Sequence, residues 1–277
     1  MGSAIAAALI RGGVCVVATV AGRSERTARL AEHAEIELVP NLDAVVRSAD
    51  VVLSIVPPGA ASVASENVVR SAVNQETQLL IADLNAIAPG TARRIQSVAA
   101  EAGHELVDGS ISGPPPWKAG TTRIYLSGGR APEIAALPFD GVERIVVGDR
   151  VGSASAVKMS TASVYKGSTA LLAQALLAAD ANGVLEHVLA DLRSGAPELV
   201  ARAERRLATA ASKSGRYVGE MHEIAATQSA AGLTPALFEA MAEIYATLAE
   251  TPAATKDREE INAGESLGEV LESMRKL

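Results

Sequence analysis

The sequence predicts an α/β fold in its first part and an all-α domain after it, and three observations lead to this prediction. Short β-branched runs alternate with helical patterns from the start of the chain to about residue 150. Several of these runs are apolar throughout, which is typical of parallel strands covered by helices on both faces. Beyond that point, helical patterns follow one another with almost no strand signal. We therefore expect two domains, 1–150 and 151–277, the first built on a doubly wound parallel sheet.

The composition is that of an ordinary soluble globular protein, with 48% hydrophobic and 3% aromatic residues among 277. A formal net charge of -7 argues against a nucleic-acid partner, which usually meets a basic face. Cys15 is the only cysteine, so an intrachain disulfide is excluded. No apolar run approaches the ~20 residues that span a bilayer, and no basic stretch precedes the apolar opening. We expect a cytoplasmic protein without a membrane partner.

The strands and helices of the first domain can be placed from the apolar periodicity. The expected strands are 14–20, 36–39, 50–56, 78–84, 104–111, 122–128 and 144–149. The expected helices between them are 25–34, 41–48, 60–73 and 89–102. Pro89 suits the first turn of the last helix, where a missing N–H costs nothing.

The second domain begins with a helix over 153–182, which would be about 45 Å long. Asn182-Gly183 marks its end. Its small, apolar surface is too extensive for one copy of the remaining helices to cover, so we expect a homodimer. The remaining helices are expected at 185–193, 197–212, 215–231, 235–250 and 257–275. We expect the last, which is highly charged, to be solvated or to pack in the dimer.

The chain opens with "MGSAIAAALIRGG", which reads as the first helix of a Rossmann-type dinucleotide-binding unit. Such a helix normally follows a strand and a Gly-x-Gly turn, on which the cofactor pyrophosphate lies. That strand would be central, between those expected at 14–20 and 50–56. The prediction is therefore a Rossmann-type sheet whose first strand is missing from this chain. Gly2 then becomes a candidate cofactor-binding residue, and we expect the 277 residues to bind cofactor weakly. Two explanations stay open: translation begins upstream of Met1, or the cofactor site is compromised.

"AGRS" follows the strand expected at 14–20, where the adenosine ribose of a dinucleotide would lie. An acidic residue there would bind a free 2′-hydroxyl, whereas Arg23 with Ser24 suits a 2′-phosphate. The pattern favours NADP over NAD. The alternative is a solvated loop arginine before a serine N-cap.

Two strand ends, "SIVPPGA" and "ADLNAIAP", should face the ligand crevice of a doubly wound sheet. Val56, Pro57 and Asn85 are therefore candidate cofactor-binding residues. The alternative is that Pro57-Pro58 only terminates a strand.

"DGSISGPPP" supplies hydroxyls and exposed N–H groups at another strand end. Ser112 and Gly113 are therefore candidates to hold a substrate carboxylate. A Ser/Gly-rich turn without function is the alternative.

Lys158 lies in the apolar start of the long helix, and at 100° per residue Thr161 and Tyr165 share its face. A lysine partly removed from water can serve in proton transfer, whereas a solvated surface charge is the alternative. Lys166 lies about 80° away from this polar stripe, and either interpretation stays open for it. The four histidines show no metal-ligand spacing, so we expect no metal.

Taken in order, "GRS", "ADVVLSIVPP", "DLNAIAP", "VDGSISGPPP", "SASAVKM" and "YVGEMHEIA" resemble the β-hydroxyacid dehydrogenases. This superfamily includes 3-hydroxyisobutyrate dehydrogenase and 6-phosphogluconate dehydrogenase. The similarity runs from Met1 to about Tyr245 and is greatest to a bacterial phosphogluconate-dehydrogenase-like branch.

The resemblance implies a role for individual residues. Lys158 matches the catalytic lysine, Ser112 and Gly113 match the substrate-binding pair, and Asn85 matches a position near the nicotinamide ribose. The family usually has an asparagine where this chain has Ala162. The resemblance therefore leaves the familiar small hydroxyacids in doubt as substrates, and Thr161 is the candidate to replace the missing hydrogen-bond partner.

These observations predict an NADP-dependent oxidoreductase that acts on a small carbonyl or β-hydroxy acid, with Lys158 as general acid–base. The small-molecule substrate itself is not predicted. An imine reductase on the same fold is one alternative, although the lysine argues against it. A non-catalytic dinucleotide-binding or scaffold protein is the other.

Overall fold

The computed structural model describes residues 1–255 and 265–275 of the chain. The chain divides into two compact units, Met1–Met159 and Ser160–Leu277. The first unit extends beyond the boundary expected after residue 150, because it includes the start of the long helix α7 (Ser153–Ala181).

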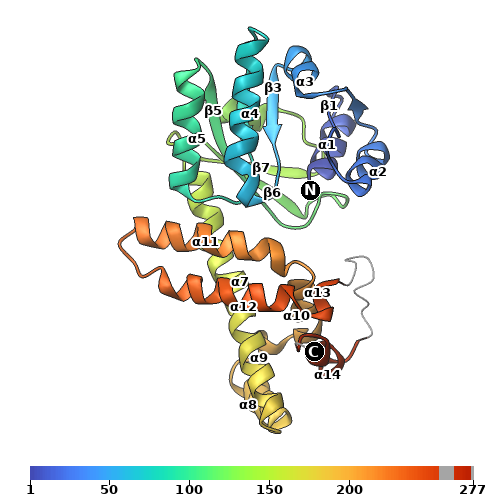
Figure 1. The fold of residues 1–277 in the computed structure, drawn as a ribbon, viewed down its shortest axis with the longest axis vertical. Helices are drawn as coiled ribbons and strands as arrows, with labels where there is room; N and C mark the ends of the chain where they lie inside the picture. The colour runs from blue at the N-terminus through green and yellow to red at the C-terminus, as the bar shows by residue number, and fades with distance from the viewer. Residues whose placement is uncertain (256–264, 276–277) are drawn as a thin grey trace. The chain divides into compact units, whose positions relative to one another are not determined.

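A five-stranded sheet forms the centre of the first unit (Figure 1). Its order is β3 (Val51–Ser54), β4 (Leu80–Asp83), β5 (Glu105–Ser112), β6 (Thr122–Ser127) and β7 (Val142–Gly148). Neighbouring strands are parallel except β5 and β6, which pair antiparallel. The prediction of a parallel sheet is wrong for this pair, because the connection over 113–121 is too short for a parallel crossover.

Helices cover both faces of this sheet, which confirms the doubly wound fold. The helices of the first unit are α1 (Gly2–Arg11), α2 (Glu25–His33), α3 (Leu42–Ser48), α4 (Ala61–Asn74), α5 (Pro89–Glu101) and α6 (Ala131–Ala136), with a 3-10 turn over Pro58–Ala60. Leu80 and Ala82 of β4 join the core that contains α1 and α6. Ile81 faces the opposite core, against α4 and α5. The sequence did not predict α6, which is too short to show a helical period.

A second, two-stranded sheet pairs β1 (Val17–Ala18) with β2 (Glu37–Leu38) in parallel. Both strands are shorter than the apolar runs that predicted them. Among the described residues, no backbone ladder joins β1 to β3. This agrees with the Rossmann-type order, in which these two strands are not neighbours.

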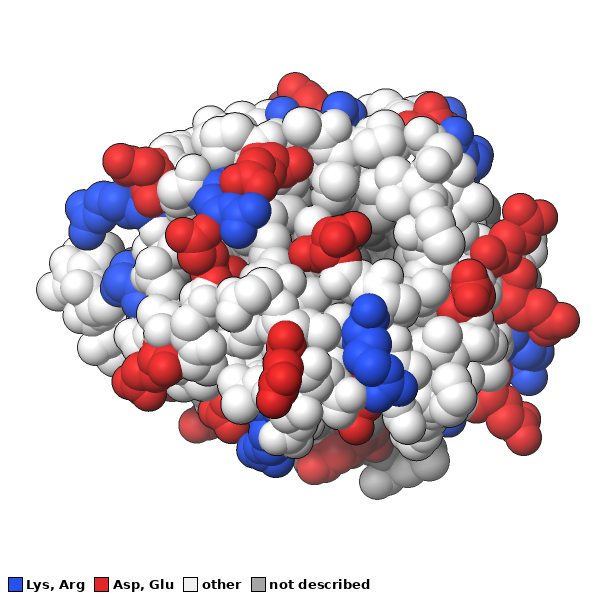
Figure 2. All heavy atoms as spheres, turned by 90° about the horizontal axis from the view of Figure 1, so that it is seen from above, with Lys and Arg blue, Asp and Glu red and all other residues white. Residues whose placement is uncertain are grey.

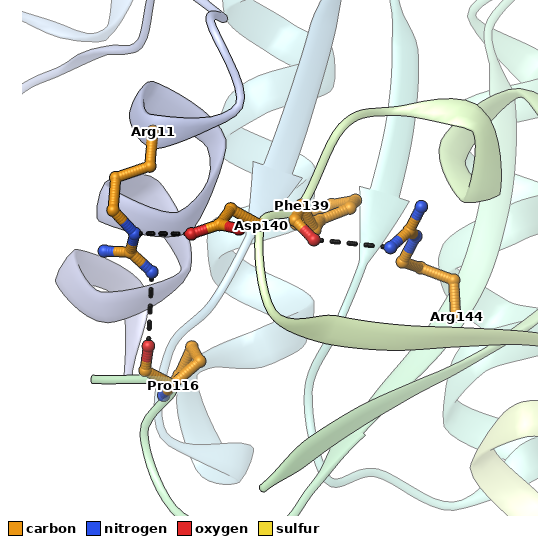
Figure 3. A network of polar contacts seen from close by, with 5 residues as sticks. All are labelled: Arg11, Pro116, Phe139, Asp140 and Arg144. Atoms are coloured by element: carbon orange, nitrogen blue, oxygen red, sulfur yellow. Dashed lines mark hydrogen bonds and ion pairs between the residues drawn. The ribbon is translucent and has the colours of Figure 1, made fainter. Parts of the chain in front are cut away.

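Arg11 at the end of α1 ties together two loops of the first unit (Figure 3). Its Nε donates to Asp140 at 2.8 Å, and its second guanidinium nitrogen reaches the Pro116 carbonyl at 3.4 Å. Arg144 donates in turn to the carbonyl oxygen of Phe139 at 3.3 Å. The half-exposed ion pair contributes at most about 1 kcal/mol. Its role is to anchor the connection between β5 and β6 against α1.

The described residues of the second unit form helices, which confirms the all-α prediction. After α7 come α8 (Leu185–Gly195), α9 (Pro197–Val200), α10 (Ala203–Ala211), α11 (Ser214–Ala230), α12 (Ala236–Ala249), α13 (Pro252–Thr255) and α14 (Leu267–Ser273). The helices α11 and α12 lie side by side (Figure 1). Tyr245 of α12 is fully buried and donates its hydroxyl to the carbonyl of Lys166 at 2.8 Å, which joins α12 to α7.

Two predictions for this unit are corrected. The helix expected over 197–212 is broken at Arg202, whose φ of 55° lies in the left-handed region. The helix expected over 257–275 lies partly outside the described residues, and its described part, α14, is shorter than expected and exposes only one side, which includes Glu269 and Glu272. Val270 and Leu271 of α14 are buried in the same chain, because an amphipathic face packs inward despite the charged composition.

Acidic and basic side chains are interspersed on the face of the molecule seen in Figure 2. Within the described residues, no helix has both the length and the hydropathy needed to cross a membrane. The same part of the chain contains no group of three or more His, Cys, Asp or Glu arranged to hold a metal ion.

Candidate functional site

The end of β5 carries the predicted substrate-binding pair. Ser112 is the last residue of the strand and is partly buried. Gly113 follows with a φ of 103°, and a Cβ there would lie 2.3 Å from the backbone oxygen of Thr121. Only glycine fits this position, because other residues would be strained and would collide with the neighbouring backbone.

Lys158 reaches the same strand end from α7. Its side chain is partly buried, and Nζ donates to the backbone oxygen of Ile111 at 2.8 Å. Ile111 directly precedes Ser112, so the structure brings Lys158 beside the predicted substrate-binding pair across 47 residues of sequence. An ammonium group held at such a point can donate a proton to an oxygen of a bound molecule.

The ends of β3 and β4 are joined by Asn85. Its Oδ1 accepts from the backbone N of Val56 at 2.7 Å, and its Nδ2 donates to Ser54 and Asp83 at 3.1 and 2.8 Å. The Asn85 side chain is only 2% exposed. These contacts give Asn85 the role of holding the segment Val56-Pro57 in place, whereas its predicted contact with the nicotinamide ribose stays a prediction.

Asp83 lies beneath this segment and is fully buried. Its carboxyl accepts from the backbone N and the side chain of Asn85, and from Ser65 at 3.3 Å. Burial raises the pKa of Asp83 to about 6, and the hydrogen bonds from Asn85 and Ser65 only partly oppose that rise. The polar cluster under Val56-Pro57 is therefore sensitive to pH near neutrality.

Gly2 begins α1 close to this segment. A Cβ at Gly2 would lie 3.9 Å from the Ile55 side chain, which is ordinary contact. The packing of the chain itself therefore does not require glycine here. Figure 1 shows that β3 ends on the side of the first unit where α1 starts. Met1 provides no side-chain cap for α1, and first-turn amides of this kind are suited to an anion such as a pyrophosphate.

Arg23 and Ser24 follow β1 and precede α2. Arg23 is exposed. Ser24 is the N-cap of α2, and its Oγ accepts from the backbone N of Thr27 at 3.3 Å. The N-cap alternative thus applies to Ser24, while contact of both residues with a 2′-phosphate stays a prediction. An exposed guanidinium here and the start of α1 fit the charges of a phosphorylated dinucleotide.

Thr161 and Tyr165 belong to the second unit, although they lie on the same helix as Lys158. Thr161 is partly buried, and the Tyr165 side chain is 71% exposed. Their roles in substrate binding stay predictions.

Sequence reasoning missed three buried side chains around the start of α7: Asp108, Ser127 and Ser155. The hydroxyls of Ser127 and Ser155 both donate to the Asp108 carboxyl. The available signal was the aspartate inside the apolar run "HELVDGSI", because a buried carboxylate requires donors from elsewhere in the fold.

Comparison with known proteins places this arrangement in a family. Residues 1–137 match the family described as the NAD binding domain of 6-phosphogluconate dehydrogenase, and 179–248 match a domain of unknown function, DUF1932. The conserved protein MTH1747 of unknown function, described as structurally similar to 3-hydroxyacid dehydrogenases, is 30% identical. That match covers 89% of this chain and 92% of the other, with a TM-score of 0.65. The chain belongs to the β-hydroxyacid dehydrogenase superfamily.

More distant similarities show the fold of this superfamily. The 3-hydroxyisobutyrate dehydrogenase of Mycobacterium tuberculosis is 21% identical over 94% of both chains, with a TM-score of 0.68. An imine reductase from Myxococcus stipitatus in complex with NADP+ is 18% identical over 99% of this chain and 96% of its own, with a TM-score of 0.55. The predicted NAD-binding dehydrogenase fold is confirmed.

A curated relative is an uncharacterized 28.5 kDa protein of Methanothermus fervidus, 26% identical over 170 residues. The match covers 61% of this chain and spans 64% of that protein's length.

Proposed function

We propose that this member of the β-hydroxyacid dehydrogenase superfamily is an NADP-dependent oxidoreductase that acts on a small carbonyl or β-hydroxy acid. The observation that carries the proposal is the 2.8 Å contact of Lys158 Nζ with the carbonyl of Ile111, next to Ser112 and Gly113. The contact brings a proton donor to the strand end that also offers a hydroxyl and a glycine backbone. A carbonyl compound that carries a carboxylate matches these groups.

Each residue of the site has a distinct task in this proposal. The Ser112 hydroxyl and the backbone around Gly113 bind the carboxylate of the substrate. Lys158 donates a proton to the carbonyl oxygen in reduction and receives it back in oxidation. Arg23 binds the 2′-phosphate, and Gly2 allows close approach of the pyrophosphate to α1. The nicotinamide cofactor, when bound, would supply a hydride as NADPH in reduction and take one up as NADP+ in oxidation.

The departure at Ala162 bears on the choice of substrate. Ala162 is 4% exposed and has no polar side-chain atom, where the superfamily usually has an asparagine. A substrate that relies on that amide would lose a hydrogen bond. We therefore propose that the preferred substrate differs from the familiar small hydroxyacids.

NADPH binding and turnover should be measured separately on the same preparation. Binding can be followed by NADPH fluorescence, and turnover by NADPH oxidation with a panel of β-keto acids and semialdehydes and a second panel of cyclic imines. Turnover on the first panel supports the proposal, and turnover on imines alone would replace it with the imine reductase. Binding without turnover would indicate a non-catalytic dinucleotide-binding protein. Absence of binding would favour a scaffold.

We also propose a homodimer, because α7 exposes large apolar side chains. Val164 is 66% and Leu171 is 63% exposed. Leu171→Glu should shift the protein from dimer to monomer in sedimentation velocity at tens of micromolar, while Gln174→Glu, an exposed change on the same helix, should not. A wild-type monomer at that concentration would overturn the proposal.

A further inference from the structure

Asp108 is a fully buried carboxylate on β5, and hydrogen-bond donors surround it. Oδ2 accepts from the backbone N of Gly152 at 2.9 Å and of Ser155 at 3.1 Å. The Ser155 hydroxyl donates to Oδ1 at 2.6 Å, and the Ser127 hydroxyl donates to Oδ2 at 2.8 Å. The two carboxyl oxygens of Asp108 therefore accept four hydrogen bonds from these neighbours.

These donors belong mainly to the start of α7. The first amides of a helix have no partner within the helix, and their ends carry a partial positive charge. Asp108 satisfies two such amides from a neighbouring strand. Ser127 satisfies a third, because its Oγ accepts from the backbone N of Ala154 at 3.0 Å while donating to Asp108. The cap of α7 is therefore built by β5 and β6 instead of by an N-cap side chain.

The same helix and the same strand meet again at the candidate proton donor. Ser155 and Lys158 are three residues apart on α7, which is about one turn. Their partners on β5, Asp108 and Ile111, are also three residues apart: Ser155 donates to Asp108, and Lys158 donates to Ile111. A change at the first contact should therefore move the second.

We propose that Asp108 is a positioning residue, which holds the start of α7 so that Lys158 Nζ stays at the end of β5. The catalytic consequence rests on the proposed function, whereas the placement of Lys158 does not. Asp108→Asn keeps the size of the side chain but replaces one acceptor atom by a donor, which would face other donors. Ser155→Ala removes only the hydroxyl contact.

The test is the reactivity of the Lys158 amine in the folded protein. Each variant is treated with acetic anhydride at low conversion, and peptides containing Lys158 and Lys166 are quantified by mass spectrometry. Asp108→Asn should raise acetylation of Lys158 about tenfold, and Ser155→Ala about threefold, because the amine leaves its carbonyl partner. Lys166 serves as the internal control, and Ser163→Ala, a hydroxyl removed elsewhere on α7, should change neither rate.

A turnover measurement adds a readout that general destabilisation would not reproduce. In an active enzyme, Asp108→Asn should lower kcat about tenfold in the wild-type background and have no further effect on Lys158→Ala. Equal losses in both backgrounds would show that Asp108 does not act through Lys158.

The outcomes separate this proposal from the proposed function. Wild-type acetylation of Lys158 in folded Asp108→Asn and Ser155→Ala overturns the positioning role, whatever the turnover. If Asp108→Asn does not fold, as judged by its melting curve, Ser155→Ala alone decides. Raised acetylation in a protein that turns over no substrate keeps the positioning role and removes the proposed function.

Discussion

Lys158 and Lys166 lie on the same helix, but their ammonium groups have different partners in the two units. In the first unit, Lys158 donates to the neutral carbonyl of Ile111. In the second, Lys166 forms an ion pair with Glu220 and lies 4.5 Å from the centre of the Tyr217 ring. Glu220 is almost completely buried and also contacts Arg216 at 3.2 Å.

This difference separates a lysine with a structural role from the candidate proton donor. The Lys166 ammonium is a countercharge of the buried Glu220 carboxylate, and a buried carboxylate that loses such a partner is destabilising. The Lys158 ammonium instead donates to a backbone carbonyl next to Ser112 and Gly113, where a bound molecule could receive its proton. The structure thus gives Lys166, for which the sequence left both interpretations open, the role of a structural ion pair with Glu220.

The largest effect on folding is expected from breaking the pair in the second unit. Lys166→Met should lower the free energy of unfolding by about 3–5 kcal/mol, because the buried Glu220 would lose one of the two cations that it contacts among the described residues. Urea unfolding measures this change. Replacing both residues, as Lys166→Met with Glu220→Leu, should recover most of the loss. A loss below about 1 kcal/mol in the single variant would mean that the pair behaves as a solvated one.

The buried carboxyl of Asp83 in the first unit extends the comparison, because it accepts hydrogen bonds from the neutral side chains of Asn85 and Ser65, whereas Glu220 contacts two cations. The pKa of Asp83 is raised from 3.8 to about 6, so between these two pH values the folded protein keeps a proton that the unfolded chain has already released. Stability from this group is complete below about pH 4 and is lost as the pH rises through about 6. Across this pH range the free energy of unfolding falls by about 3 kcal/mol because of Asp83.

Urea unfolding between about pH 4 and pH 7.5 tests this pH dependence. The free energy of unfolding of the wild type should fall relative to that of Asp83→Asn as the pH rises. Parallel curves for the two proteins would contradict the raised pKa.

A smaller effect is expected from replacing Arg23. This exposed cation is proposed to bind a phosphate of the cofactor, whereas Arg216 pairs with Glu220 within the chain. Arg23→Ala should weaken the binding of NADPH by about 1.5–3 kcal/mol and leave the binding of NADH nearly unchanged. Only NADPH carries the 2′-phosphate that can form a charge-assisted contact with Arg23. Fluorescence titration with both cofactors measures it, and Arg29→Ala on α2 is the control. Equal losses for NADPH and NADH would exclude a 2′-phosphate contact.

Local sequence patterns predicted most of the fold. Apolar runs placed β3 to β7, and the small-residue pattern placed α7 to within one residue of its observed end. The break at Arg202 was not predicted, because neither glycine nor proline marks it. The antiparallel pairing of β5 and β6 was also missed, since periodicity carries no information on strand direction.

The candidate site was predicted only in part, and the limit is sequence distance. Lys158 and Ser112 were found from local pattern and family resemblance. The role of Asp108 depends on donors 19 to 47 residues away, and that of Lys166 on Glu220 of another helix. Such partners follow from tertiary packing, which residue spacing does not encode.

The most direct test of the central claim is the turnover of Lys158→Ala, measured together with its affinity for NADPH. Loss of a general acid should lower kcat by about 10²–10⁴-fold while NADPH affinity stays within about twofold of wild type. Lys158→Arg should fail as well, because a guanidinium with a pKa above about 12 does not readily exchange its proton. If both variants keep more than about a tenth of the wild-type kcat, Lys158 is not the proton donor.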